Sequence, residues 1–164
     1  MQIRLAGIVP ESIVDGPGMR YVIFTQGCPH HCEGCHNPAT HDFSGGYLEN
    51  TQNIIDQILK NPLLQGVTLS GGEPMMQPQP LIEIVQAIKQ HGKDVVVYSG
   101  FTYERILADG GDKAKLLKLC DYLIDGKFIF NQRSLSLQFR GSLNQRIIDI
   151  QASLQQGQIV EKSF

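Results

Sequence analysis

The sequence predicts an α/β fold with parallel strands, arranged as a partial, open β/α barrel. Short β-branched segments alternate with segments of helical periodicity, which is typical of βαβ units around a parallel sheet. A polar or glycine-rich site follows each of these strands. The chain has 164 residues, fewer than the ~200 that a closed eight-fold barrel needs, so it supplies only part of a barrel or an open sheet.

The chain reads as a single domain over residues 1–164. We find no internal repeat, low-complexity tract or linker that would divide it. We expect the core of the domain at about residues 7–150, whereas the tail, residues 151–164, shows no informative pattern.

The first half of the predicted sheet contains two strands and one helix. Residues 21–25 (Tyr-Val-Ile-Phe-Thr) show little polar alternation, which is typical of a strand buried on both faces. Residues 51–60 have apolar side chains at i, i+1, i+4 and i+5, which predicts an amphipathic helix capped by Asn50 or Thr51. Residues 66–70 (Gly-Val-Thr-Leu-Ser) form the second predicted strand.

Two strands and three helices follow in the second half. Helical periodicity covers residues 81–91 and ends at Gly92, a residue type that often terminates helices. The remaining predicted elements are a strand at 94–99, helices at about 103–108 and 113–120, and a strand at 122–125. Crossovers between parallel strands are right-handed, so we expect the carboxyl ends of all four strands at one rim.

Composition and charge disfavour two classes of partner. The chain is 41% hydrophobic and 18% charged, with a net charge of −2, so it has no basic field for nucleic acid or an anionic membrane surface. The N-terminus lacks the charged start and apolar run of a secretory signal, and no segment reaches the ~18 apolar residues of a membrane span. We therefore expect a cytoplasmic protein whose cysteines do not form a disulfide framework.

Three of the four cysteines lie on one short loop. Cys28, Cys32 and Cys35 stand at i, i+4 and i+7 among Gly and Pro residues, so their thiolates can converge on one metal centre. Iron–sulfur clusters are held by cysteine thiolates, and a four-iron cluster with three cysteines keeps one iron open for a small ligand. Zinc is the alternative, with a fourth ligand from His30, His31, His36 or His41. The fourth cysteine, Cys120, is predicted to be a small core residue.

A glycine pair follows the second strand at the same rim as the cysteine loop. Gly71-Gly72 lets the backbone approach a ligand where a Cβ would collide, and Glu73 adds a carboxylate. Alone, this pair is more often a tight turn between a strand and a helix. Its occurrence beside a three-cysteine loop favours iron–sulfur chemistry.

Together these motifs resemble those of the radical S-adenosylmethionine enzymes, which have a Cys-x3-Cys-x2-Cys loop after the first strand and Gly-Gly-Glu after the second. Within them the chain is most similar to small activases of glycyl-radical enzymes. That narrower similarity depends on Asp15-Gly16-Pro17-Gly18-Met19-Arg20, Cys35-His36-Asn37-Pro38 and Phe139-Arg140-Gly141-Ser142-Leu143-Asn144-Gln145-Arg146. It spans about Gly7 to Ile150.

The resemblance implies a radical SAM fold and two cofactors. A [4Fe-4S] cluster would be held by Cys28, Cys32 and Cys35, and S-adenosylmethionine would bind its open iron. Reductive cleavage would give a 5′-deoxyadenosyl radical that takes a hydrogen from a glycine of the partner. The partner implied is the large glycyl-radical subunit of anaerobic ribonucleoside-triphosphate reductase, with a low-potential electron donor such as flavodoxin or ferredoxin.

The resemblance also implies two sets of binding residues. Those for S-adenosylmethionine are Gly34, Cys35, His36, Gly71, Gly72, Glu73, Ser99, Asp125 and Lys127. Those for the partner are Asp15, Gly16, Pro17, Gly18, Arg140 and Arg146. Tyr98 stands where related activases have a second acidic residue, so the sequence leaves undecided whether a monovalent cation site exists. The alternatives are an activase of another glycyl-radical enzyme and a non-catalytic zinc-binding module.

Overall fold

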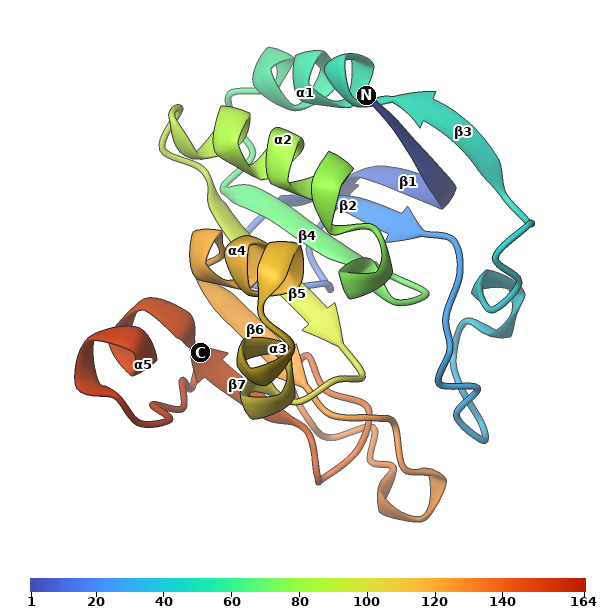
Figure 1. Ribbon diagram of the computed structural model, residues 1–164, viewed down its shortest axis with the longest axis vertical. Coiled ribbons are helices and arrows are strands. Elements are labelled where there is room, and N and C mark those ends of the chain that lie inside the picture. The colour runs from blue at the N-terminus through green and yellow to red at the C-terminus, as the bar shows by residue number, and fades with distance from the viewer.

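The structure is a computed structural model that describes residues 1–164, and its centre is a seven-stranded sheet in the order β3-β1-β2-β4-β5-β6-β7 (Figure 1). The strands are β1 (Gln2–Ser12), β2 (Arg20–Thr25), β3 (Tyr47–Asn50), β4 (Gly66–Gly71), β5 (Asp94–Ser99), β6 (Tyr122–Asp125) and β7 (Arg146–Asp149). The helices are α1 (Thr51–Lys60), α2 (Pro78–Lys89), α3 (Tyr103–Asp109), α4 (Gly111–Leu119) and α5 (Ile150–Gln156), with 3-10 turns η1 (Pro38–Thr40), η2 (Pro74–Met76) and η3 (Phe130–Gln132).

The four strands predicted from the sequence form the parallel part of this sheet. β2, β4, β5 and β6 pair in that order, each parallel to the next. The expected parallel strands make up only this part of the sheet, because β1, β3 and β7 pair antiparallel. β1 escaped the sequence pattern because two register shifts interrupt its alternation, and β3 because its residues are largely exposed.

The starts of two helices differ from the prediction, a third helix was not predicted, and each difference has a local cause. α2 begins at Pro78 rather than Leu81, since prolines at positions 78 and 80 suit a first turn whose N–H groups need no partner. α4 begins at Gly111 rather than Lys113, directly after Gly110, which has a positive φ of 65°. α5 lies in the tail, where the Asp149 side chain caps its first turn. None of these helices is long and apolar enough to cross a membrane.

The main core lies between one face of the sheet and the helices. Alternate residues of the parallel strands, such as Tyr21, Leu69 and Val97, pack with buried residues of α1, α2, α3 and α4. The intervening residues point to the opposite face, where Val96, Ile124 and Ile147 form a small second cluster beside Tyr98. This second face, at the carboxyl ends of the parallel strands, contributes to the candidate site.

Candidate functional site

The cysteine loop leaves the sheet at the end of β2 and is closed at its base. Gly27 N donates to Thr40 O at 2.7 Å, and Cys28 N donates to His41 O at 3.2 Å. Within the loop, Gly, Pro and the 3-10 turn η1 replace any longer regular element. The base is therefore fixed to the sheet while the segment that carries the three thiols projects beyond it.

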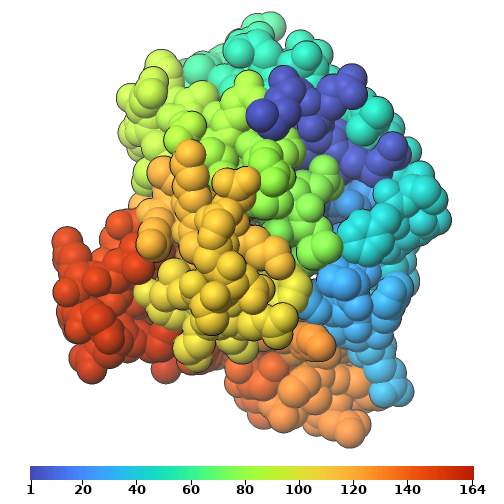
Figure 2. All heavy atoms as spheres, viewed as in Figure 1, coloured from blue at the N-terminus to red at the C-terminus, as the bar shows by residue number.

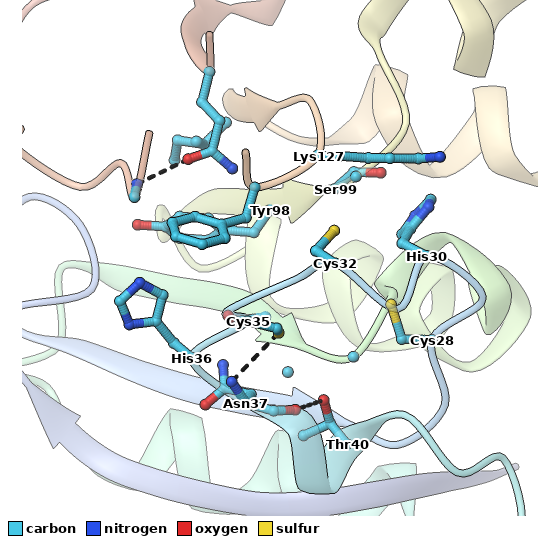
Figure 3. Close-up of a pocket in the computed structure, with 18 of the residues that line it drawn as sticks. Cys28, His30, Cys32, Cys35, His36, Asn37, Thr40, Tyr98, Ser99 and Lys127 are labelled. Carbon is cyan, nitrogen blue, oxygen red and sulfur yellow. Dashed lines mark hydrogen bonds between the residues drawn. The ribbon is translucent and has the colours of Figure 1, made fainter. Parts of the chain in front are cut away.

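The three thiols line one cavity of about 570 Å³ (Figure 3). All are free, and burial raises the pKa of the Cys28 thiol above its ordinary value. No three His, Cys, Asp or Glu side chains lie close enough to hold a single metal ion. A four-iron cluster gives each thiolate its own iron and fits three thiols spread around one cavity.

The Gly71-Gly72 turn lies against the base of the cysteine loop. Gly72 N donates to Thr25 O at 2.8 Å, and Glu73 N donates to Gly27 O at 2.8 Å. A Cβ on Gly72 would lie 2.4 Å from Gly27 O, which is closer than real Cβ contacts allow. Gly71 has a φ of 100°, in the region that favours glycine. Both glycines line the cavity, and their lack of side chains also lets the turn approach the loop.

Glu73 does not face the cavity. Its carboxylate is 1% exposed and accepts hydrogen bonds from Met75 N at 3.0 Å, Gly100 N at 2.7 Å and the Ser99 hydroxyl at 2.9 Å. The His30 ring lies 2.7 Å from the same carboxylate. The acid expected to orient a cofactor is therefore bonded within the protein, and the Ser99 hydroxyl, although Ser99 lines the cavity, is bonded to it.

The opposite wall of the cavity comes from the long segment between β6 and β7. Figure 2 shows this segment (orange) beside the cysteine loop (light blue) at one end of the molecule. The predicted site residues that line the cavity are Cys28, Cys32, Cys35, His36, Gly71, Gly72, Ser99, Lys127, Asp15 and Arg140. The structure thus gathers residues from five separate parts of the chain around one space.

Seven predicted site residues lie outside that cavity: Gly16, Pro17, Gly18, Gly34, Glu73, Asp125 and Arg146. Gly34 borders a second cavity of about 430 Å³, and a Cβ there would lie 2.3 Å from the Phe130 ring. Asp125 is 1% exposed, accepts from Tyr103 N at 2.8 Å and forms an ion pair with Arg146. The hydrogen bonds that Arg146 donates to Asp125 and to Glu104 raise the pKa of the arginine.

The predicted partner turn, Asp15-Gly16-Pro17-Gly18, is held by a buried arginine. Arg20 is fully buried and donates to Pro17 O at 2.9 Å and to the Thr68 hydroxyl at 2.8 Å. Thr68 in turn donates to Asp15 O at 2.8 Å. Only Asp15 of this turn lines the cavity, and Gly16, Pro17 and Gly18 lie behind it.

Several cavity residues were not among those predicted to bind S-adenosylmethionine, the cluster or the partner. They are Val14, Phe24, His30, Asn37, Thr40, His41, Ser70, Tyr98, Gly100, Ile124, Gly126, Phe128, Leu137, Phe139, Gly141 and Gln145. Burial, followed by the nearby charge of Asp15, raises the pKa of Tyr98, so its hydroxyl stays protonated near neutral pH. The recurrence of Phe between residues 126 and 145 was one available indication, because apolar side chains grouped at a surface mark binding sites.

Comparison with known proteins decides the family. Residues 14–148 match the family described as 4Fe-4S single cluster domain. The chain is 38% identical over 147 residues to the anaerobic ribonucleoside-triphosphate reductase-activating protein of Vibrio cholerae, covering 84% of this chain and 92% of the relative. The chain belongs to this family of activating proteins. The proteins of that name from Haemophilus influenzae and Enterobacteria phage T4 are 37% and 36% identical to it, covering 84% and 85% of this chain and 92% and 90% of the relatives.

Membership of the activating-protein family confirms the resemblance inferred from the motifs, and the [4Fe-4S] cluster predicted from the cysteine loop is confirmed at the level of the family. A solved structure, that of QueE from Escherichia coli, is similar with a TM-score of 0.48 and 17% identity, covering 62% of this chain and 54% of that one.

Proposed function

We propose that this activating protein converts an anaerobic ribonucleoside-triphosphate reductase to its radical form by cleaving S-adenosylmethionine at a [4Fe-4S] cluster. The observation that carries the proposal is the meeting of three free thiols and the Gly71-Gly72 turn at one cavity. The names of the relatives supply the reductase as partner. The sheet, open at β3 and β7, is then part of a β/α barrel with the reaction at its rim.

When bound, the cluster would supply one electron for cleavage of the S–C5′ bond of S-adenosylmethionine. That cleavage would give methionine and a 5′-deoxyadenosyl radical able to take a hydrogen from a glycine Cα of the reductase. Cys28, Cys32 and Cys35 hold the cluster. The electron comes from a low-potential donor such as flavodoxin or ferredoxin.

The chain's own residues bind and orient the cofactor. Gly71 and Gly72 leave room for the methionyl end, and Lys127 offers a cation to its carboxylate. His36 packs edge-on to Phe128 at 5.1 Å between ring centroids, and both line the cavity, where they form an apolar surface for the adenosyl group. A cavity of about 570 Å³ lies within the usual range for such ligands.

Exclusion of water falls partly to the partner. Val14 and Asp15 lie at the cavity, and Ile13 and Val14 are 77% and 73% exposed, which provides an apolar contact beside the turn. A radical that attacks a glycine Cα also needs a dry site.

The glycine loop of the reductase would enter between Asp15-Gly16-Pro17-Gly18 and the cysteines, with Arg140 on the opposite side. Arg146 is not available to bind the partner, because its guanidinium forms ion pairs with Asp125 and Glu104.

A reconstitution experiment tests the cluster. Anaerobically reconstituted protein should hold about four irons per chain, the number that the cluster type implies. Ala substitution of Cys28, Cys32 or Cys35 should abolish formation of 5′-deoxyadenosine, whereas Cys120→Ala, in the core and away from the cavity, should leave it unchanged. One zinc per chain, without colour, would support the zinc-binding alternative.

A label-transfer experiment tests the partner. Reductase with deuterium at its glycine Cα is mixed with the loaded protein, reductant and S-adenosylmethionine. We expect faster cleavage with the reductase present, deuterium in the deoxyadenosine and a glycyl radical by electron paramagnetic resonance. Transfer from a different glycyl-radical enzyme alone would assign the chain to that partner instead.

A further inference from the structure

His30 carries the contact between the cysteine loop and the rim of the sheet. It lies between Cys28 and Cys32, and its Nε2 is 2.7 Å from Glu73 Oε1. The two side chains are only 6% and 0% exposed. Residues 29–36 make no other hydrogen bond to any residue after Asn37 in the chain. The His30–Glu73 contact is therefore the one polar link of this part of the loop, beside the ring contacts of His36 with Phe128 and of His31 with His41.

Glu73 is a fixed acceptor for that link. Its second oxygen accepts from Met75 N and the Ser99 hydroxyl, and Gly100 N shares the oxygen that faces His30. These donors come from η2 and the end of β5, so the carboxylate cannot turn without losing bonds made in the interior. The carboxylate thus holds the His30 ring at a defined place on the rim.

The surroundings of the ring match its shape. A Cβ on Gly100 would lie 2.4 Å from the His30 ring, so a glycine is needed where the ring rests on the backbone. Phe101 packs edge-on to the ring at 4.6 Å between centroids. The end of β5 therefore packs closely against the imidazole that the cysteine loop provides.

We propose that His30 is a positioning residue, whose bond to Glu73 sets the cysteine loop, and with it the cluster, at a fixed place relative to the Gly71-Gly72 turn. The inference rests on the proposed function and assigns a task to Glu73 other than contact with the cofactor. Alignment of the S–C5′ bond with the cluster depends on that placement. Misplacement by ~1 Å costs on the order of 10²-fold in rate.

A pair of amide substitutions isolates the bond. The Gln amide nitrogen reaches about the position of Nε2, whereas the Asn amide reaches only that of Nδ1. His30→Gln should keep the bond to Glu73, and His30→Asn should lose it. Glu33→Gln is the matched control, since Glu33 is exposed in the same loop, lies outside the cavity and makes no hydrogen bond.

Three measurements are made on each variant. In the iron-free chain, amide hydrogen exchange over residues 28–36 should speed up in His30→Asn but not in His30→Gln or Glu33→Gln. In the loaded protein, His30→Asn should lower S-adenosylmethionine cleavage by about 10²-fold. The change that S-adenosylmethionine causes in the paramagnetic resonance spectrum of the reduced cluster should be broadened in that variant alone.

The outcomes separate this inference from the proposed function. Loss of iron in His30→Asn but not His30→Gln would also support it, because the loop would then need the bond even to retain the cluster. Equal exchange and equal cleavage in His30→Asn and wild type, or equal damage in both amide variants, would overturn it. Failure of the loaded wild-type protein to cleave S-adenosylmethionine would instead contradict the proposed function.

Discussion

Gly72 lies where two parts of the site meet without room for a side chain. A Cβ there would be 2.4 Å from Gly27 O and 2.9 Å from Thr40 O, both backbone atoms at the base of the cysteine loop. Backbone atoms cannot move aside as a flexible side chain can. The requirement for glycine at this position therefore includes the fit of the protein to itself as well as room for a cofactor.

We predict that Gly72→Ala displaces the base of the cysteine loop. The variant should lose about 1–3 kcal/mol of stability, as overpacked sites do, and should retain less iron after reconstitution. Gly7→Ala is the control, because nothing lies within 4 Å of a Cβ there. Urea denaturation and iron analysis measure both effects. Full iron retention in Gly72→Ala with weaker S-adenosylmethionine binding would assign the glycine to the cofactor alone.

For single residues, the spacing of the cysteines in the sequence was enough to predict that three thiols line one cavity, because a short loop keeps its own residues close. The same reasoning failed for Glu73 and Asp125, which turn inward. Their partners, His30 and Arg146, lie 43 and 21 residues away. A carboxylate in sequence shows no preference for solvent, ligand or a distant cation, so its direction is decided by tertiary packing.

At the scale of elements, an ion pair joins β6 to β7. Arg146 Nε donates to Asp125 Oδ1 at 3.0 Å, and the guanidinium also reaches Glu104 at the start of α3. The Arg146 hydrogen bond lowers the pKa of Glu104 below its ordinary value. The antiparallel edge strand is thus fixed to the buried end of a parallel strand by side chains as well as by its backbone.

We predict that Arg146→Ala destabilises the protein by about 2 kcal/mol, because the buried Asp125 carboxylate keeps only Tyr103 N as a donor. Glu104→Gln should cost less than ~1 kcal/mol, since Glu104 is 61% exposed. Urea midpoints of the two variants give the comparison. Similar losses of stability in both variants would show that the exposed contact of Arg146 with Glu104 contributes as much as its buried contact with Asp125.

The elements that sequence reasoning found are the long or strongly patterned ones. β2, β4, β5 and β6 are short but apolar runs, and their order identified the parallel part of the sheet. β3 escaped detection because its residues are largely exposed and it exists by pairing with β1. Such strands have little pattern of their own, since the partner strand supplies most of their stabilisation.

For the whole molecule, the core and the cysteine loop are separate. No residue between Gln26 and His41 belongs to the main hydrophobic core. The loop begins at β2 and returns to β3, and both strands pair with β1. The frame of the sheet is therefore complete without contributions from the loop, unlike zinc fingers, which need metal to fold.

We predict that removal of iron by a chelator leaves the fold in place. The far-UV circular dichroism spectrum should be unchanged, and faster amide exchange should be confined to about residues 27–41 and the segment between β6 and β7 that faces them. A cooperative loss of secondary structure on chelation would contradict this separation of loop and core.

The order of strands in the sheet has a consequence for biosynthesis. No strand is inserted between two earlier neighbours, because β2 and then β3 join β1, and β4 to β7 each extend the opposite edge in turn. A chain emerging from the ribosome can therefore enlarge its sheet by addition alone, without reopening pairs already made. Of the parts that surround the cavity, the segment between β6 and β7 is synthesised last, and only β7 and α5 follow it. The thiols accordingly face an uncovered rim until the segment between β6 and β7, which forms the opposite wall of the cavity, has been synthesised.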